Sequence, residues 1–236
     1  MGRANLRLEA KRGHVALAEK DRGDSVRARQ HILRRLSKRL AAGAVVATAW
    51  VAVGLAQSAT PRDVVERLHA SLLEVMQSGG GLGYDGRYRQ LEPVLEDSYD
   101  FPLMTRIAVG PAWGDFDEAQ RARLVELFTE MSIANYAARF DGYGGERFET
   151  LGEEPAPRDA VLVRTRLVRP NDSPVELNYV LKESQEGWRI IDVLLESKFS
   201  ELARQRSEFA AVLRDGGAPD LAATLERKIA ELAAEG

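Results

Sequence analysis

The sequence predicts an α+β fold in which helices precede and follow a short, twisted antiparallel sheet. Three observations lead to this prediction. Apolar residues recur at helical spacing up to about residue 140, alternate with polar residues between 147 and 195, and return to helical spacing from residue 200. Because short turns join the strands, we expect a meander of about four strands with the helices on one concave face. With 44% apolar residues among 236, the chain can form one ordinary core.

Four helices are expected before the sheet, over residues 61–77, 85–98, 101–109 and from 117 to about 140. The first is predicted to end at the glycine run 79–83, which we interpret as a flexible connector. The second is predicted to break at Pro93. The fourth begins at Asp117, whose side chain can cap the helix while Gln120 completes a capping box.

Four strands are expected next, over residues 147–152, 160–169, 175–182 and 188–195. Turn residues separate the last three, at 171–174 and 185–187. The last strand has little polar surface on either side, so it is predicted to be central in the sheet. Two helices close the chain, over 200–214 and 219–234, with Gly216 and Gly217 between them.

Charge divides the chain into two parts. Residues 1–40 contain 12 Lys and Arg residues against four acids, whereas the remainder contains 21 against 32. An acidic body repels phosphate backbones, so nucleic acid is not an expected partner.

The basic part has the order of a secretory signal. Four basic residues between 34 and 39 precede an uncharged run over 40–59 that ends in small residues. We therefore predict an N-terminal extension and signal peptide over 1–59, with cleavage near 56–59, and a mature domain over 60–236. An uncleaved membrane anchor is the alternative, because about 17 apolar residues can just span a bilayer.

Familiar catalytic groups are scarce in the predicted mature domain. The chain has no cysteine, and His69 is its only histidine after residue 60. This removes most familiar active sites, among them thiol chemistry and zinc sites built from Cys or paired His. Neither a phosphate-binding glycine loop followed by Lys nor a dinucleotide fingerprint occurs. We expect no cofactor and no metal, and an exported domain of this kind points to binding or transport.

Short segments in a fixed order cover nearly all of residues 61–230. They are Tyr99-Asp100-Phe101 with Met104, Gly110-Pro111-Ala112-Trp113, Gln120-Arg121, Phe128, Tyr136-Ala137, Tyr143, Leu177-Asn178-Tyr179-Val180-Leu181, Trp188-Arg189-Ile190-Ile191-Asp192-Val193, Ser200-Glu201-Leu202 and Arg206-Ser207-Glu208-Phe209. This ordered set resembles the MlaC family of periplasmic lipid carriers, also called the toluene-tolerance family. The ending over residues 212–217 is most similar to its hopanoid-associated HpnM branch.

The resemblance implies a twisted sheet backed by helices that encloses an apolar cavity for the acyl chains of a phospholipid, with a hopanoid as the alternative cargo. It also implies a shuttle through the periplasm between two partners, an outer-membrane lipoprotein complex and an inner-membrane ABC-type lipid transporter. It carries over no catalytic residue. The large apolar residues expected between helices and sheet are candidates for lipid binding, although each also suits an ordinary core: Phe101, Met104, Ile107, Trp113, Phe128, Met131, Tyr136, Phe140, Tyr179, Ile190 and Val193.

Polar residues leave other interpretations open. Asp192 is expected either to pair with an arginine such as Arg206, or to have a raised pKa and a functional role. The second case predicts an exported enzyme with Asp192 as general base and Tyr179 as hydrogen-bond donor in one closed pocket. On the strand alternation, Asp192 is expected to point away from the apolar face, which disfavours the enzyme. A pure interaction subunit would have a packed core without a cavity. Candidates for contact with a headgroup or a partner are Arg87, Arg89, Arg106 and Arg139.

Overall fold

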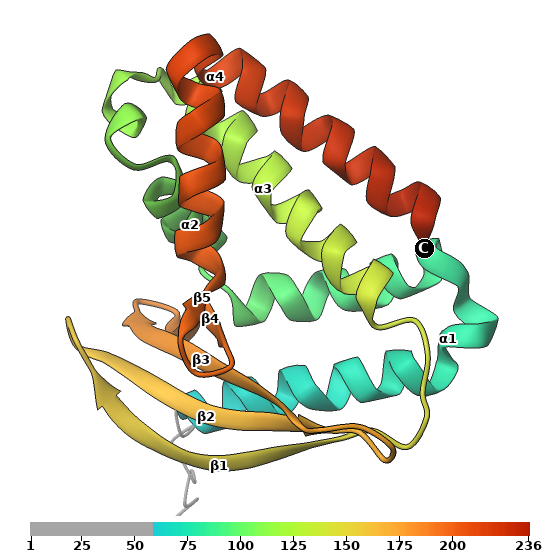
Figure 1. Ribbon diagram of the computed structural model, residues 1–236. Helices are drawn as coiled ribbons and strands as arrows, with labels where there is room; N and C mark the ends of the chain where they lie inside the picture. The colour runs from blue at the N-terminus through green and yellow to red at the C-terminus, as the bar shows by residue number, and fades with distance from the viewer. Residues whose placement is uncertain (1–58) are drawn as a thin grey trace, which may run out of the picture. The chain divides into compact units, whose positions relative to one another are not determined.

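The computed structural model describes residues 59–236, so the predicted extension and the signal up to residue 58 lie outside the described residues. The elements in chain order are α1 (Pro61–Ser98), α2 (Phe101–Val109), the 3-10 helix η1 (Gly110–Asp115), α3 (Glu118–Arg139), β1 (Arg147–Ala156), β2 (Ala160–Val168), β3 (Val175–Ser184), β4 (Gly187–Leu195), β5 (Phe199–Ser200) and α4 (Glu201–Glu235). This is the predicted α+β order, and Figure 1 shows the helices on one side of a curved sheet. Within residues 59–236, no helix has both the length and the hydropathy that a bilayer crossing requires.

Helix α1 contains the first two predicted helices, which join and reverse direction at Gly83. Its start is fixed by a capping box between Thr60 and Asp63. The first helical segment ends at Gly83, inside the glycine run as predicted, although the glycines before Gly83 are helical and form no connector. Pro93 does not break the second segment, since helical backbone continues to Ser98. The reversal falls on Gly83, whose φ of 60° and ψ of 177° belong to a region that is essentially open to glycine alone. The two halves of α1 therefore run in roughly opposite directions (Figure 1).

The sheet contains five strands in the order β1-β2-β3-β4-β5, and every neighbouring pair is antiparallel. The strand not predicted is β5, a two-residue segment that pairs only with the end of β4. Strand β1 is longer than expected because a bulge at Gly152 lets it continue to Ala156.

The prediction that β4 is central is wrong, because only the short β5 lies outside it. Its apolar residues on both sides have another cause. Helices α1, α2 and α4 all contact β4. In addition, the start of α2 covers part of its edge, where the amide of Asp100 donates to the carbonyl of Ile190 at 2.9 Å. A strand covered by helices in this way requires apolar residues although it lies near the edge of the sheet.

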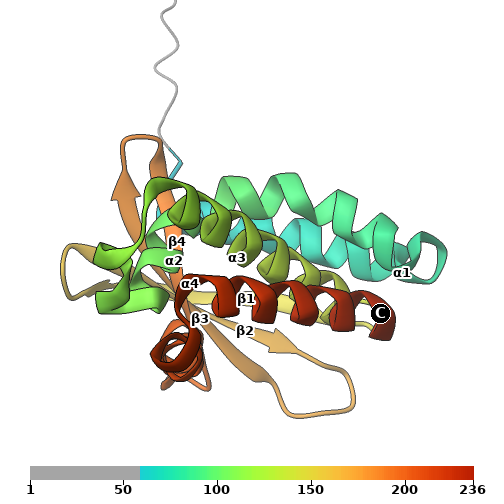
Figure 2. The ribbon, with the colours of Figure 1, turned by 90° about the horizontal axis from the view of Figure 1, so that it is seen from above.

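Helix α3 begins as predicted, with a capping box in which the Asp117 side chain accepts from the Gln120 amide at 2.8 Å. Helix α4 begins at Ser200, which caps it, and changes direction at Gly217, which has a φ of 66° and a ψ of −154°. The second half of α4 then lies alongside α3 (Figure 2), where Arg123 and Glu226 form an ion pair of 2.7 Å.

One contiguous core fills the space between helices and sheet. Its largest fully buried side chains come from both halves of α1, from α3, from the middle of the sheet and from α4: Leu68, Leu72, Leu91, Leu95, Leu124, Leu127, Phe128, Ile133, Tyr179, Leu181, Ile190 and Leu221. The buried faces of the kinked helices α1 and α4 therefore pack in the same core as the sheet.

Two glycine substitutions, one at the bend in α1 and one beside it, test the assigned backbone conformation. Gly83→Ala is expected to destabilise the fold by about 1–3 kcal/mol, because alanine is strained at this φ and ψ. Gly81→Ala, two residues away with helical backbone and equally open space around it, is expected to stabilise by about 0.5–1 kcal/mol. Urea unfolding of both variants checks this, and equal effects would contradict the assigned bend.

Candidate functional site

A pocket of about 280 Å³ lies between the sheet and the helices α3 and α4. This is close to the lower end of the range for ligand pockets, roughly 300–1,000 Å³. The end of α3 forms one wall, the two halves of α4 form another, and β3, β4 and the start of α2 form the base. The apolar side chains that line it are Tyr99, Phe101, Met104, Met131, Tyr136, Phe140, Leu177, Tyr179, Val193, Leu195, Phe209, Val212, Leu225 and Leu232.

The structure brings most of the candidate residues from the sequence together at this pocket. Those that line it are Phe101, Met104, Met131, Tyr136, Phe140, Tyr179 and Val193. Four others lie elsewhere. Phe128 and Ile190 are fully buried in the core, whereas Ile107 and Trp113 are partly buried and pack against the core from outside the pocket. Only the first turn of α2 reaches the pocket, so Ile107 and Trp113, which follow it, do not.

Several lining residues were not predicted from the sequence, and most of them belong to α4. Phe209 and Val212 lie one helical turn apart in its first half, and Leu225 and Leu232 lie two turns apart in its second half. This spacing marks an apolar stripe on each half and could have identified them. The spacing alone does not reveal that the bend at Gly217 turns both stripes toward the same pocket.

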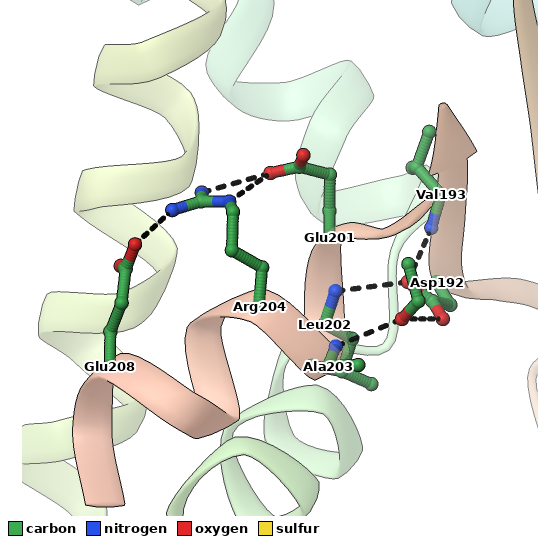
Figure 3. Close-up of polar contacts among 8 residues, drawn as sticks. Asp192, Val193, Glu201, Leu202, Ala203, Arg204 and Glu208 are labelled. Carbon is green, nitrogen blue, oxygen red and sulfur yellow. Dashed lines mark hydrogen bonds and ion pairs between the residues drawn. The ribbon is translucent and has the colours of Figure 1, made fainter. Parts of the chain in front are cut away.

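Asp192 lines the pocket, which corrects the expectation that it points away from the apolar face. Its carboxylate is held by the start of α4 (Figure 3). One oxygen accepts from the Ser200 hydroxyl at 2.6 Å, and the other accepts from the Leu202 amide at 3.1 Å and from the Val193 amide at 2.8 Å. Ser200 in turn accepts from the Ala203 amide at 2.9 Å. These bonds fasten the first turn of α4 to strand β4.

The predicted pairing of Asp192 with Arg206 is wrong. Among residues 59–236 Asp192 forms no ion pair, and the guanidinium of Arg206 lies beside Gly110 instead. The free N–H groups and positive dipole of a helix start replace the expected cation. Burial raises the pKa of Asp192 above its usual range, and the hydrogen bonds from Ser200, Leu202 and Val193 partly oppose this rise.

The tyrosine hydroxyls of the pocket are also bound to protein partners. The hydroxyls of Tyr99 and Tyr136 hydrogen-bond to each other. The hydroxyl of Tyr179 lies 3.0 Å from Nε2 of His69, on α1. Asp192 and Tyr179 thus share one pocket, as the enzyme interpretation requires, but their polar atoms hold the fold together. Within the described residues, no group of His, Asp and Glu side chains is arranged to hold a metal ion.

His69 is a neutral, structural histidine. It is 4% exposed, and its ring stacks on Phe148 of β1 with the centroids 3.9 Å apart. Burial lowers its pKa to about 3. Because the imidazole contacts residues of β1 and β3, it joins α1 to the sheet beneath the pocket.

The four arginine candidates have different positions. Arg139 lines the pocket, whereas Arg89 and Arg106 are exposed outside it. Arg87 is 3% exposed, and its guanidinium donates to the carbonyls of Ala137 at 2.7 Å and Gly236 at 3.0 Å. It therefore ties α1 to the end of α3 and is not available to a headgroup.

Comparison with known proteins agrees with the fold. The family model of the MlaC protein matches residues 66–227. A solved structure of the phospholipid-binding protein from Ralstonia solanacearum, in complex with a phospholipid, superposes with a TM-score of 0.66 at 22% identity. The similarity covers 74% of this chain and 99% of that one. No curated protein matches the chain.

These features define an α+β protein with a pocket between a curved sheet and a bent helix. The chain belongs to the MlaC family.

Replacement of His69 by Gln is expected to change how stability depends on pH. The folded-state pKa of about 3 lies below the unfolded value near 6.5, so the unfolded chain takes up a proton that the folded chain does not. The wild type should therefore lose about 1.4 kcal/mol per pH unit through this group as the pH falls from about 6.5 toward about 3. Urea titrations over this range should show a flatter profile for His69→Gln, and parallel profiles would contradict the assignment.

Substitution of Asp192 separates its structural role from a catalytic one. Asp192→Ala leaves the Leu202 amide and the Ser200 hydroxyl without their acceptor, which should cost about 1–3 kcal/mol of unfolding free energy. Asp97→Ala is the control, because its carboxylate makes exposed ion pairs with Arg67 and Arg189 and should cost less than about 1 kcal/mol. Unchanged stability of Asp192→Ala in denaturant titrations would favour the enzyme interpretation.

Proposed function

We propose that this protein binds a lipid in the pocket between α3, α4 and the sheet, and carries it through the periplasm between two membranes. The observation that supports the proposal most directly is the pocket itself, lined by aromatic, aliphatic and methionine side chains, in a MlaC-family chain. The bound phospholipid in the Ralstonia solanacearum protein adds support from a related fold. Met104 and Met131 suit acyl chains of variable shape, because thioether side chains adapt their packing.

The physical need for such a carrier follows from the cost of exposing acyl chains. Each methylene contributes about 0.8 kcal/mol on burial, so a free two-tailed lipid is very unstable in water. A protein pocket offers the tails an apolar environment similar to that of a bilayer, so transfer between the two needs no covalent chemistry. Asp192 and the tyrosine hydroxyls of the pocket are engaged in hydrogen bonds within the protein, which is consistent with a site that binds without reacting.

Family membership also supports the route. The proposed partners are an outer-membrane lipoprotein complex and an inner-membrane ABC-type lipid transporter, with export directed by the signal peptide within the N-terminal extension over residues 1–59. Two cargo classes remain candidates. The solved neighbour supports a phospholipid, and the similarity of residues 212–217 to the HpnM branch supports a hopanoid.

The test is mass spectrometry of lipid that co-purifies with the chain from the periplasm of a Gram-negative host. The wild type should carry about one lipid per chain. Thr224→Trp places an indole in the pocket and should reduce bound lipid about tenfold or more, the effect of about 1–3 kcal/mol of overpacking. Ala223→Trp, on the exposed side of the same turn, is the control and should retain the lipid.

Two results would contradict the proposal. One is a wild-type protein that is folded but carries no lipid and takes up none from vesicles. The other is equal lipid content in Thr224→Trp and Ala223→Trp, since lipid bound elsewhere on the surface would not respond to a filled pocket.

A further inference from the structure

The charged side chains around the pocket are not all paired. Arg204 is bound on both sides, by Glu201 at 2.9 Å and by Glu208 (Figure 3). Arg139, in the last turn of α3, and Lys228, in the second half of α4, also line the pocket and are exposed. Within residues 59–236, neither of these two side chains forms an ion pair or a hydrogen bond. Two cationic side chains from different helices, neither paired with a residue of the range 59–236, therefore lie where the apolar pocket meets solvent.

The charge of Arg139 acts on the pocket interior. Burial raises the pKa of Tyr136 to about 12; the hydrogen bond with Tyr99 and the positive charge of Arg139 oppose that rise, and the negative charge of Glu201 adds to it. Tyr136 lines the pocket, and its hydroxyl is bound to Tyr99. Arg139 therefore lies close to an aromatic wall that a bound acyl chain would contact, and its guanidinium has no protein acceptor there.

The carboxylates near the opening do not cancel these cations. Glu201 and Glu208 both form ion pairs with Arg204. The positive charge of Arg204 offsets much of the repulsion that the two carboxylates would exert on a bound anion. Asp192 is buried more deeply and is bound by the hydroxyl and amides at the start of α4. An anion attached to an acyl chain in the pocket would thus find Arg139 and Lys228 as its free partners.

We propose that Arg139 and Lys228 bind the phosphate group of the lipid whose acyl chains occupy the pocket. This inference rests on the proposed function and chooses between its two cargo classes. A phosphodiester carries a negative charge and acceptor oxygens for both cations, whereas an uncharged hopanoid gains nothing from them. The pair therefore selects phospholipid over uncharged lipid.

The test compares phosphatidylglycerol with diacylglycerol of identical acyl chains, each delivered to the full chain in non-ionic detergent micelles. Mass spectrometry measures the lipid retained after gel filtration. The double variant Arg139→Gln/Lys228→Gln should retain about tenfold less phosphatidylglycerol, the effect of two partly exposed charge contacts, and unchanged diacylglycerol. The control Arg89→Gln/Arg227→Gln removes the same charge from exposed positions outside the pocket and should behave as the wild type.

Several results would overturn the inference while leaving the carrier function intact. These are equal retention of the two lipids by the wild type, a preference for an uncharged hopanoid over phosphatidylglycerol, or equal losses in the double variant and its control. Stoichiometric binding of inorganic phosphate without a preference for phosphatidylglycerol would assign the cations to free phosphate and would also overturn it. A wild type that retains no lipid of any class would instead refute the proposed function, and the inference with it.

Discussion

The backbone reversals at Gly83 and Gly217 are the constraint on which the rest of the structure depends. Both glycines have a φ near +60° with an extended ψ, a combination that a side chain makes costly. Each reversal divides one long helix into two segments, and the second half of α4 lies along α3 (Figure 2). Without the bend at Gly217, the second half of α4 could not lie along α3, and the pocket would lose the wall that contains Leu225 and Leu232.

The direction of α4 depends on its first turn as well as on its bend. Asp192 and Ser200 satisfy N–H groups that a helix start leaves without partners, and they do so from the adjacent strand. The carboxylate of Asp192, which its apolar sequence context made a candidate general base, therefore connects β4 to the start of α4. Its raised pKa follows from its burial at that joint.

Local features of the structure were predictable from the sequence, whereas features that depend on long-range contacts were not. The capping box at Asp117 and the alternation of the strands require only neighbouring residues, and both are confirmed. The position of β4 near the edge of the sheet was mispredicted, because its apolar residues result from the helices that cover it. The role of Asp192 as a hydrogen-bond acceptor depends on where α4 begins. The lining residues of α4 were missed for the same reason, since their stripes meet only after the chain reverses.

The distribution of polar groups suits a site that holds an amphiphile without transforming it. Tyr99 with Tyr136 and Tyr179 with His69 bind each other within the protein, so the interior exposes apolar surface and few free hydrogen-bonding atoms. Among the charged residues that line the pocket, the two without an ion pair or hydrogen bond to residues 59–236 are Arg139 and Lys228, and both are exposed. Affinity for acyl chains and recognition of a headgroup would then come from different residues. Because the aromatic and aliphatic part of the lining offers acyl chains an environment like that of a bilayer, the proposed carrier would bind them without favouring either membrane, and the direction of transfer would have to come from the partners.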